Sequence, residues 1–369
     1  MLERYRRIGH GFDYWLALVI FVLSVFGVIM IFSASAVVSY ERFNSPYGYA
    51  SKQAMALGIG LVAWFVMTMI DYRFWQKKAT VFLVITIVLL LAVFLPGIGI
   101  ERNGAHRWID LGSFSLQPSE LIKLFFLMYI SAWLSKKGEK INDLNKGIIP
   151  FVIILLVVIF LIMKEPDMGT MSVIAVFSMA VFFVSGVAWH YLLIFMAGAI
   201  ALFRVLIYAA PYRLQRLMVF LNPNQAQSGA GYHINQALLA LGSGGLLGLG
   251  FGQSKQKYLF LPEAHTDSIF AIIGEELGFL RAALVILAFV FIAWRGLEIA
   301  KRAPDKFGQL VATGITVWFI WQAFVNIGAM LGLLPLTGVP LPFISYGGTS
   351  LVVSFAAAGI LLNISKQTT

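Results

Sequence analysis

Residues 14–38 read YWLALVIFVLSVFGVIMIFSASAVV and contain no charged side chain. A helix needs about 20 mostly apolar residues to cross a bilayer core about 30 Å thick, so this stretch is predicted to be a transmembrane helix. Arg4, Arg6 and Arg7 precede it, but the run is too long for the core of a cleavable signal peptide and has no obvious small-residue cleavage site. We therefore expect it to remain as the first span.

Apolar runs of this kind recur along the whole chain. Of its 369 residues, 60% are hydrophobic and 12% are charged, whereas soluble domains have roughly 45–50% apolar and about 25% charged residues. The predicted spans cover about residues 14–38, 53–70, 79–96, 117–134, 147–163, 168–186, 190–209, 268–294, 307–333 and 349–364. The predicted fold is one all-α polytopic membrane domain over residues 1–369. It has about ten transmembrane helices and a long, partly re-entrant outer loop at about residues 210–267, between the seventh and eighth spans.

The basic residues set the expected orientation of these spans. The formal net charge is +10, and Lys and Arg lie mostly in short loops beside the spans, with more of them on the side that holds the N-terminus. Because basic loops tend to stay in the cytoplasm, both termini are expected to be cytoplasmic. The same placement argues against nucleic acid as a partner and favours contact with anionic lipid.

Disulfides, a zinc site and a glycine-rich nucleotide-binding loop are not expected. The chain has no Cys, and its five His show no close metal-ligand spacing, so neither a disulfide framework nor a zinc site is predicted. The glycine-rich run 242–252 (GSGGLLGLGFG) matches neither the P-loop pattern nor the dinucleotide-binding pattern. Close packing by small residues is its favoured role, and backbone N–H groups that bind an anionic headgroup are the alternative.

Three outer loops, at residues 97–118, 210–267 and 334–348, are expected to open on the same side of the membrane and to form a site there. Glu120 and Lys123 lie three residues apart on one helix face near this side. Charges inside a membrane usually face the bundle interior or a wet cavity, so the pair either locks helices together or lines a cavity, or does both. Asp167 begins the sixth span and is expected to cap that helix and to pair with a cavity cation.

The densest polar cluster, residues 261–268 (LPEAHTDS), comes directly before the eighth span. Periodicity alone favours Asp267 as a helix cap. A partly desolvated carboxylate at the mouth of a cavity can instead serve as a general base. Both interpretations stay open on this evidence.

At these residues the sequence resembles the SEDS family of bacterial membrane proteins, which includes FtsW, RodA and SpoVE. The matching segments run in family order over nearly the whole chain: Arg107-Trp108-Ile109, residues 117–123 (QPSELIK), 165–170 (EPDMGT), 242–245 (GSGG), 261–276 and 342–350 (PFISYGGTS). Segments 31–36 (IFSASA), 254–257 (SKQK) and 262–267 (PEAHTD) are more similar to FtsW members than to RodA members. Ser268 stands where the family often has Phe, outside the polar motif.

The resemblance implies a ten-helix peptidoglycan glycosyltransferase of the bacterial plasma membrane, with its active site on the extracytoplasmic face. Such enzymes polymerise lipid II, a disaccharide-pentapeptide on undecaprenyl diphosphate. They work with a class B penicillin-binding protein, a transpeptidase, and with other divisome or elongasome membrane proteins. The essential acid of the family corresponds to Asp267, and its buried acid–base pair to Glu120 and Lys123.

The remaining site residues are predicted around this acid. Asp167, Glu263 and His265 are expected to support catalysis or line the cavity. Substrate-binding contacts are expected at Arg107, Gln236, Ser243, Lys255, Ser345, Gly347 and Gly348. The lipid diphosphate leaving group needs positive charge or a divalent cation such as Mg²⁺ or Mn²⁺, but the sequence does not identify a metal ligand.

Two other functions are compatible with the same chain. A lipid II flippase would need polar groups through the full depth of the bundle, whereas here they concentrate toward the outer side. A scaffold that recruits division or elongation proteins would leave the acidic outer residues dispensable.

Overall fold

The computed structural model describes residues 11–95, 98–102, 105–110, 115–208, 211–221 and 229–368. The helices are α1 (Tyr14–Phe43), α2 (Gly48–Met69), α3 (Tyr72–Ala92), α4 (Pro118–Ser135), α5 (Ile149–Lys164), α6 (Met168–Val184), α7 (Trp189–Tyr208), α8 (Pro211–Leu221), α9 (Ala230–Gly244), α10 (Ile269–Lys301), α11 (Lys306–Met330) and α12 (Gly348–Ser365). Short 3-10 and π turns (Gly138–Asn142 and Leu144–Ile148) lead into α5, and three strands are β1 (Gly99–Arg102), β2 (Ala105–Asp110) and β3 (Ser115–Leu116).

Each of the ten predicted spans is a helix in the structure. Among the described residues, eight helical segments are long and apolar enough to cross a membrane. The other two spans are α6, a shorter apolar helix, and α4, which carries Glu120 and Lys123. Helix ends extend beyond the apolar runs where a polar residue caps them. For example, α3 begins at Tyr72 rather than near residue 79, because Asp71 accepts a hydrogen bond from the Arg73 amide.

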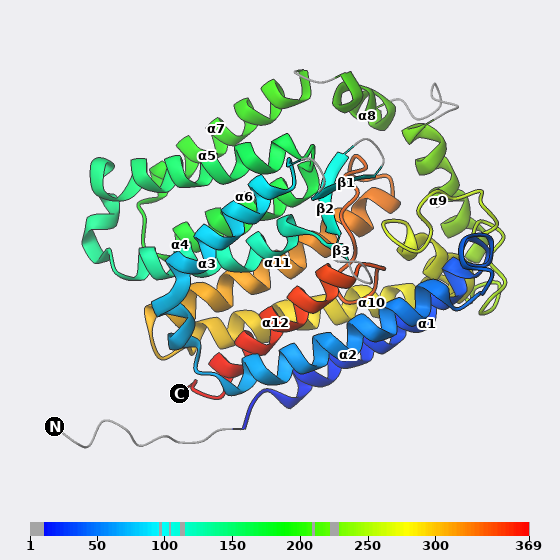
Figure 1. Ribbon diagram of the computed structural model, residues 1–369, viewed down its shortest axis with the longest axis horizontal. Coiled ribbons are helices and arrows are strands. Elements are labelled where there is room, and N and C mark those ends of the chain that lie inside the picture. The colour runs from blue at the N-terminus through cyan, green and yellow to red at the C-terminus, as the bar shows by residue number, and fades with distance from the viewer. Residues whose placement is uncertain are drawn as a thin grey trace.

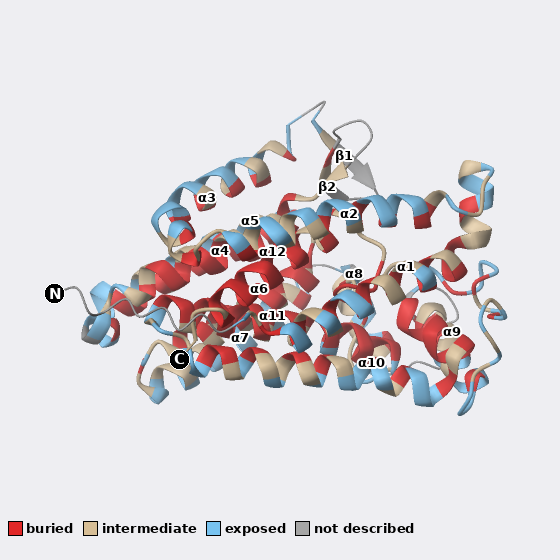
Figure 2. Cartoon of the chain, turned by 90° about the horizontal axis from the view of Figure 1, so that it is seen from below, coloured by how far each residue is buried: buried red, intermediate tan, exposed pale blue. Residues whose placement is uncertain are grey.

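The helices form one elongated bundle (Figure 1). Helices α11 and α12 are the most deeply buried spans, while α7 lies at the edge of the bundle with most of its surface exposed. Helix α12 packs along α2, and α11 packs along α10 and α6. Figure 2 shows the buried residues gathered in this centre, with exposed residues on the outer helices.

The prediction of an all-α chain needs one correction, in the loop at residues 97–118. This loop contains a small antiparallel sheet in the order β1-β2-β3, with Gly99 opposite Ile109 and Ile109 opposite Leu116. Strands this short give too little alternation to be recognised in sequence. The sheet lies at the same end of the bundle as α8 and α9 (Figure 1), and we call this end the mouth.

The long outer loop predicted at residues 210–267 is folded and packs back on the bundle, as expected, although residues 222–228 lie outside the described part. It contains α8 and α9, and α9 packs against α10. The glycine-rich run begins in the last turn of α9 and continues beside a kink in α10. At this kink, Gly278 has φ +79°. A Cβ on Gly248 would lie 2.2 Å from the Glu276 carbonyl oxygen. The packing role is thus confirmed for Gly244 and Gly248, whereas Gly242, Gly245 and Gly252 have nothing within 4 Å of an added Cβ.

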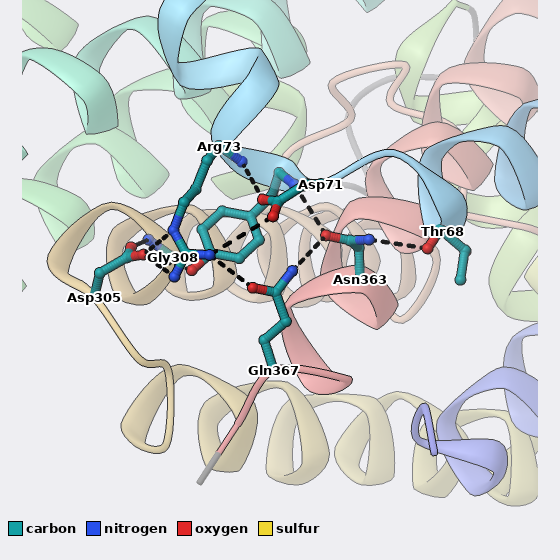
Figure 3. Close-up of polar contacts among 8 residues, drawn as sticks. Thr68, Asp71, Arg73, Asp305, Gly308, Asn363 and Gln367 are labelled. Carbon is teal, nitrogen blue, oxygen red and sulfur yellow. Dashed lines mark hydrogen bonds and ion pairs between the residues drawn. The ribbon is translucent and has the colours of Figure 1, made fainter. Parts of the chain in front are cut away.

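Polar side chains tie together the opposite end, which we call the far end (Figure 3). Arg73 donates to Asp305 through Nε at 2.9 Å and to Gln367 through Nη1 at 2.8 Å. Asn363 donates to the Thr68 carbonyl and accepts from the Tyr72 amide, both at 2.9 Å. These bonds join the α2–α3 turn to the start of α11 and the end of α12.

The glycine packing predicts a matched pair of variants on α9. A Cβ on Gly244 would lie 2.0 Å from the Gly274 carbonyl oxygen, whereas a Cβ on Gly242 meets nothing within 4 Å. We expect Gly244→Ala to destabilise the protein by about 1–3 kcal/mol, as overpacking typically does. Gly242→Ala should leave stability unchanged or slightly raise it. Thermal melting of both purified variants measures this, and equal melting temperatures would contradict the packing.

Candidate functional site

A large cavity of about 1570 Å³ lies at the mouth, where the three outer loops converge. The expectation that these loops share one side is therefore confirmed. Eight of the predicted site residues line the cavity: Arg107, Glu120, Asp167, Glu263, His265, Asp267, Gly347 and Gly348. The lining also includes apolar side chains from α7 and α11, such as Phe203 and Val325, so the site combines charge with apolar surface.

Asp267 is not the cap of α10. The residue at the N-cap position is Ser268, whose side chain makes no capping hydrogen bond, so the capping interpretation is wrong. The Asp267 carboxyl instead lines the cavity. Burial raises the pKa of Asp267 to about 6, the nearby Glu263 carboxylate adds to the rise, and Thr266, Arg216 and Arg107 oppose it. A carboxylate with this pKa is ionised near neutral pH and basic enough to accept a proton.

The loop that carries Asp267 is fastened to the loop before α12. Ser345 Oγ donates to the Thr266 carbonyl at 2.7 Å, and the Tyr346 amide donates to the His265 carbonyl at 2.9 Å. Gln53 of α2 bridges the second loop, because its amide donates to the Ser345 carbonyl and accepts from the Gly347 amide, both at 3.1 Å. Ser345, predicted to bind substrate, is buried and braces the backbone instead of lining the cavity.

The two other polar residues of this loop have different surroundings. The His265 ring lies 4.3 Å from the Tyr49 ring, centroid to centroid, and 5.5 Å from the Tyr346 ring. Burial lowers the pKa of His265, so its imidazole is neutral and forms part of the wall. Glu263 is exposed and accepts a hydrogen bond from Thr266 Oγ1 at 2.8 Å.

Glu120 and Lys123 form a buried ion pair at 2.8 Å, with side chains 2% and 1% exposed. Lys123 Nζ also donates to Gln322 Oε1 on α11 at 3.1 Å and lies over the Trp318 ring. Glu120 lines the cavity while Lys123 lies beneath it. The pair therefore fills both predicted roles, since it joins α4 to α11 and forms part of the cavity wall.

Asp167 caps α6, as predicted, by accepting from the Thr170 amide at 2.9 Å and from Thr170 Oγ1 at 2.8 Å. Within the described residues it forms no ion pair with a cavity cation. Arg107 instead donates to the carbonyls of Glu165 and Pro166, at 2.7 and 2.6 Å. Glu165 is fully buried, and neither of its carboxyl oxygens has a hydrogen-bond partner in the described structure.

Several cationic residues that the sequence interpretation missed also line the cavity. They are Arg42, Lys52, Arg213, Arg216 and Lys257. A signal for two of them was present, because Arg213 and Arg216 lie three residues apart and share one face of α8. Together with Arg107 they make the mouth rich in positive charge.

Lys257, not Lys255, reaches the cavity. Its ammonium group contacts Glu276 Oε1 at 3.0 Å and the Gly252 carbonyl at 2.6 Å. Lys255 is exposed, and its backbone amide, not its side chain, donates to Glu275 Oε1 at 2.9 Å. Both lysines follow the same glycine-rich run, so spacing alone could not tell which of them turns inward.

Two further residues predicted to bind substrate, Gln236 and Ser243, also lie outside the cavity lining. Both are on α9, where Ser243 Oγ donates to the Ala240 carbonyl of its own helix. Within the described residues no group of three or more His, Asp or Glu side chains could hold a metal. A divalent ion here would be held by one or two carboxylates and by substrate phosphates, which is the usual arrangement for Mg²⁺.

The fold and the cavity define a polytopic membrane protein with an acidic group and a set of cations at one end of its helical bundle. The model of the FtsW/RodA/SpoVE family, described as "Cell cycle protein", matches residues 14–369. The chain belongs to this family.

Similar proteins cover nearly the whole chain. Stage V sporulation protein E of Bacillus subtilis (strain 168) is 41% identical over 355 residues, which are 96% of this chain and 97% of that protein. A probable peptidoglycan glycosyltransferase FtsW of Trichlorobacter lovleyi is 40% identical over 358 residues, covering 96% and 93%.

Solved structures agree with the fold. The rod shape determining protein RodA of Thermus thermophilus has a TM-score of 0.72 at 26% identity, with 97% of each chain covered. A chain from a peptidoglycan synthase complex that couples polymerization and crosslinking has a TM-score of 0.78 at 24% identity, covering 96% and 97%.

The buried Glu165 carboxyl predicts a pH-dependent stability. Burial raises the pKa of Glu165 to about 8 and Asp167 adds to the rise, while Arg107 and the nearby Ser119 hydroxyl oppose it. The folded protein therefore keeps a proton that the unfolded chain releases, and stability is lost as pH rises from the ordinary glutamate range to about 8. In Glu165→Gln no proton is lost at this position as pH rises. The melting temperature of the variant, relative to that of wild type, should therefore be higher at pH 9 than at pH 5.

The matched control is Glu41→Gln, at an exposed carboxyl on α1. In Glu41→Gln, the difference in melting temperature between pH 5 and pH 9 should be the same as in wild type. A Glu165→Gln variant that gains no more at pH 9 than at pH 5 would show that this carboxyl is ionised in the folded protein.

Proposed function

We propose that this protein is a peptidoglycan glycosyltransferase that polymerises lipid II on the extracytoplasmic face of the bacterial plasma membrane. The observation that carries the proposal is the Asp267 carboxyl, whose pKa is raised to about 6 at the wall of a large cavity lined by cations. Family membership and the names of the relatives support the same reaction.

The proposed reaction is an inverting displacement at the donor sugar. Asp267 takes the proton from the 4-hydroxyl of the acceptor sugar, and the hydroxyl oxygen forms a bond to the anomeric carbon of the donor. The bond from that carbon to the lipid diphosphate breaks, and the diphosphate leaves with the electron pair. Arg107 and Arg216 are suited to stabilise it, because they place positive charge at the cavity, whereas the charge of Lys257 is neutralised by Glu276.

The size of the cavity suits this reaction. Pockets for single small ligands are typically about 300–1,000 Å³, and this cavity is larger, at about 1570 Å³. Two lipid-linked saccharides must meet in one place for a chain to grow. Room for both, beside the Asp267 carboxyl, favours polymerisation over the binding of a single small molecule.

The proposed orientation follows from basic residues at the far end. Arg73, Arg295, Arg302, Lys306 and Lys366 all make their contacts there, away from the cavity. The mouth is basic too, but Lys77, Lys78, Lys136, Lys137, Lys140 and Lys146 also lie toward the far end, at the start of α3 and between α4 and α5. Because the side with more basic residues beside the spans tends to be cytoplasmic, the cavity is proposed to open to the exterior. A class B penicillin-binding protein is the proposed partner, and the similarity to a synthase complex supports it. Other divisome or elongasome membrane proteins are further proposed partners.

The assignment predicts a large loss of activity in Asp267→Asn. A general base contributes about 10²–10⁴-fold to the rate, so glycan synthesis from lipid II should fall by about that factor. The assay uses the purified protein with a class B penicillin-binding protein in proteoliposomes. Asp143→Asn is the matched control, because Asp143 is an exposed cap residue far from the cavity lining, and asparagine also caps.

The same assay separates the proposed enzyme from a flippase. With lipid II confined to the outer leaflet, a polymerase makes glycan and a flippase has nothing to deliver. A normal rate in Asp267→Asn, or glycan that forms only when the precursor starts in the inner leaflet, would contradict the assignment.

The raised pKa of Asp267 predicts an acid limb in the pH profile. The base must be ionised to accept a proton, so kcat/KM should fall about tenfold per pH unit below a midpoint near 6. Glu263→Gln removes a neighbouring negative charge that helps to raise this pKa and should move the midpoint to lower pH. A midpoint that does not respond to Glu263→Gln would assign the limb to another group.

A further inference from the structure

The backbone at Gly338 lies directly against the Asp267 carboxyl. Gly338 has φ +76°, and a Cβ at this position would come within 3.3 Å of Asp267 Oδ2. A left-handed backbone conformation and close approach both favour glycine. The position of residues 336–340, in the first half of loop 334–348, therefore determines how much room the carboxyl has.

Two amide side chains of α11, one helical turn apart, hold this loop. Gln322 Nε2 donates to the Pro340 carbonyl at 2.8 Å. Asn326 Nδ2 donates to the Val339 carbonyl and to the Asp267 carbonyl, both at 2.8 Å. Gln322 and Asn326 are 0% and 2% exposed, so both donor side chains are buried, while the Pro340 and Asp267 carbonyls belong to partly buried residues. Asn326 thus joins the backbone of Asp267 to the loop that faces its side chain.

The side-chain carbonyl oxygens of the two amides have different surroundings. Gln322 Oε1 accepts from Lys123 Nζ at 3.1 Å and from Trp318 Nε1 at 2.7 Å, so its orientation is fixed by two donors. Asn326 Oδ1 is buried without a hydrogen-bond partner in the described structure. An unpaired buried oxygen costs about 1–3 kcal/mol, which makes Asn326 a poor choice for stability alone and points to a positional role.

We propose that Gln322 and Asn326 are positioning residues that carry the geometry of the buried Glu120–Lys123 pair to Asp267. The hydrogen bond from Lys123 orients the Gln322 side chain, and Gln322 holds the Pro340 carbonyl. Asn326 holds the carbonyls of Val339 and Asp267. Gly338, next to Val339, is thereby held against the carboxyl. This inference rests on the proposed function, because the reaction is what needs the carboxyl at a fixed place.

The test compares Asn326→Leu, which has similar volume and no amide, with wild type in the lipid II polymerisation assay. A misplacement of about 1 Å can cost about 10²-fold in rate, so kcat should fall by about 10–100-fold with little change in KM. The acid limb of the pH profile should also move below its wild-type midpoint, because a loosened loop admits water to Asp267. Thr313→Val is the matched control: Thr313 is buried on α11 and bonds within its own helix, so kcat and midpoint should stay at wild-type values.

A folded Asn326→Leu variant with wild-type kcat and wild-type midpoint would overturn the inference. If this variant does not fold, Gly338→Ala probes the same contact from the loop. It should lower kcat by about 10-fold or more, and wild-type kcat in Gly338→Ala would likewise overturn the inference. Failure of the proposed function is distinguishable, because wild-type protein would then make no glycan at all.

Discussion

The buried ion pair between Glu120 and Lys123 is the constraint on which the site depends. In an apolar bundle, a charge without a partner costs several kcal/mol, so the two residues must stay together. Lys123 also donates a hydrogen bond to Gln322 of α11. The ion pair therefore holds α4 against α11 next to the cavity. Gln322 in turn donates to the Pro340 carbonyl, so the loop that faces Asp267 is bonded to this junction.

Above the junction, the mouth consists of loops that polar bonds join to helices. The loop with Asp267 is bonded to the loop before α12 through Ser345 and Tyr346, and both loops are bonded to α11 through Asn326. Such an arrangement keeps irregular backbone satisfied near a membrane, where unpaired polar groups are costly. It also leaves one carboxyl, Asp267, facing the cavity with a raised pKa.

Much of this could be predicted from the sequence, because hydrophobic run length follows directly from bilayer thickness. The ten spans, the convergence of the outer loops and the pairing of Glu120 with Lys123 all follow from local patterns. Features set by tertiary contact could not be predicted. Asp267 precedes a helix as a cap would, and only packing shows that Ser268 takes that position. The choice of Lys257 over Lys255 likewise depends on where Glu276 lies, and the small sheet was too short to leave a pattern.

The most direct test of this account is the thermal stability of Glu120→Gln, Lys123→Met and the double variant, measured on the purified protein. Each single variant leaves one buried charge without its partner and should lose about 3–5 kcal/mol of stability. The double variant removes both charges and should recover most of that loss. Single variants that melt at the wild-type temperature would show that the pair does not hold the bundle together at the mouth.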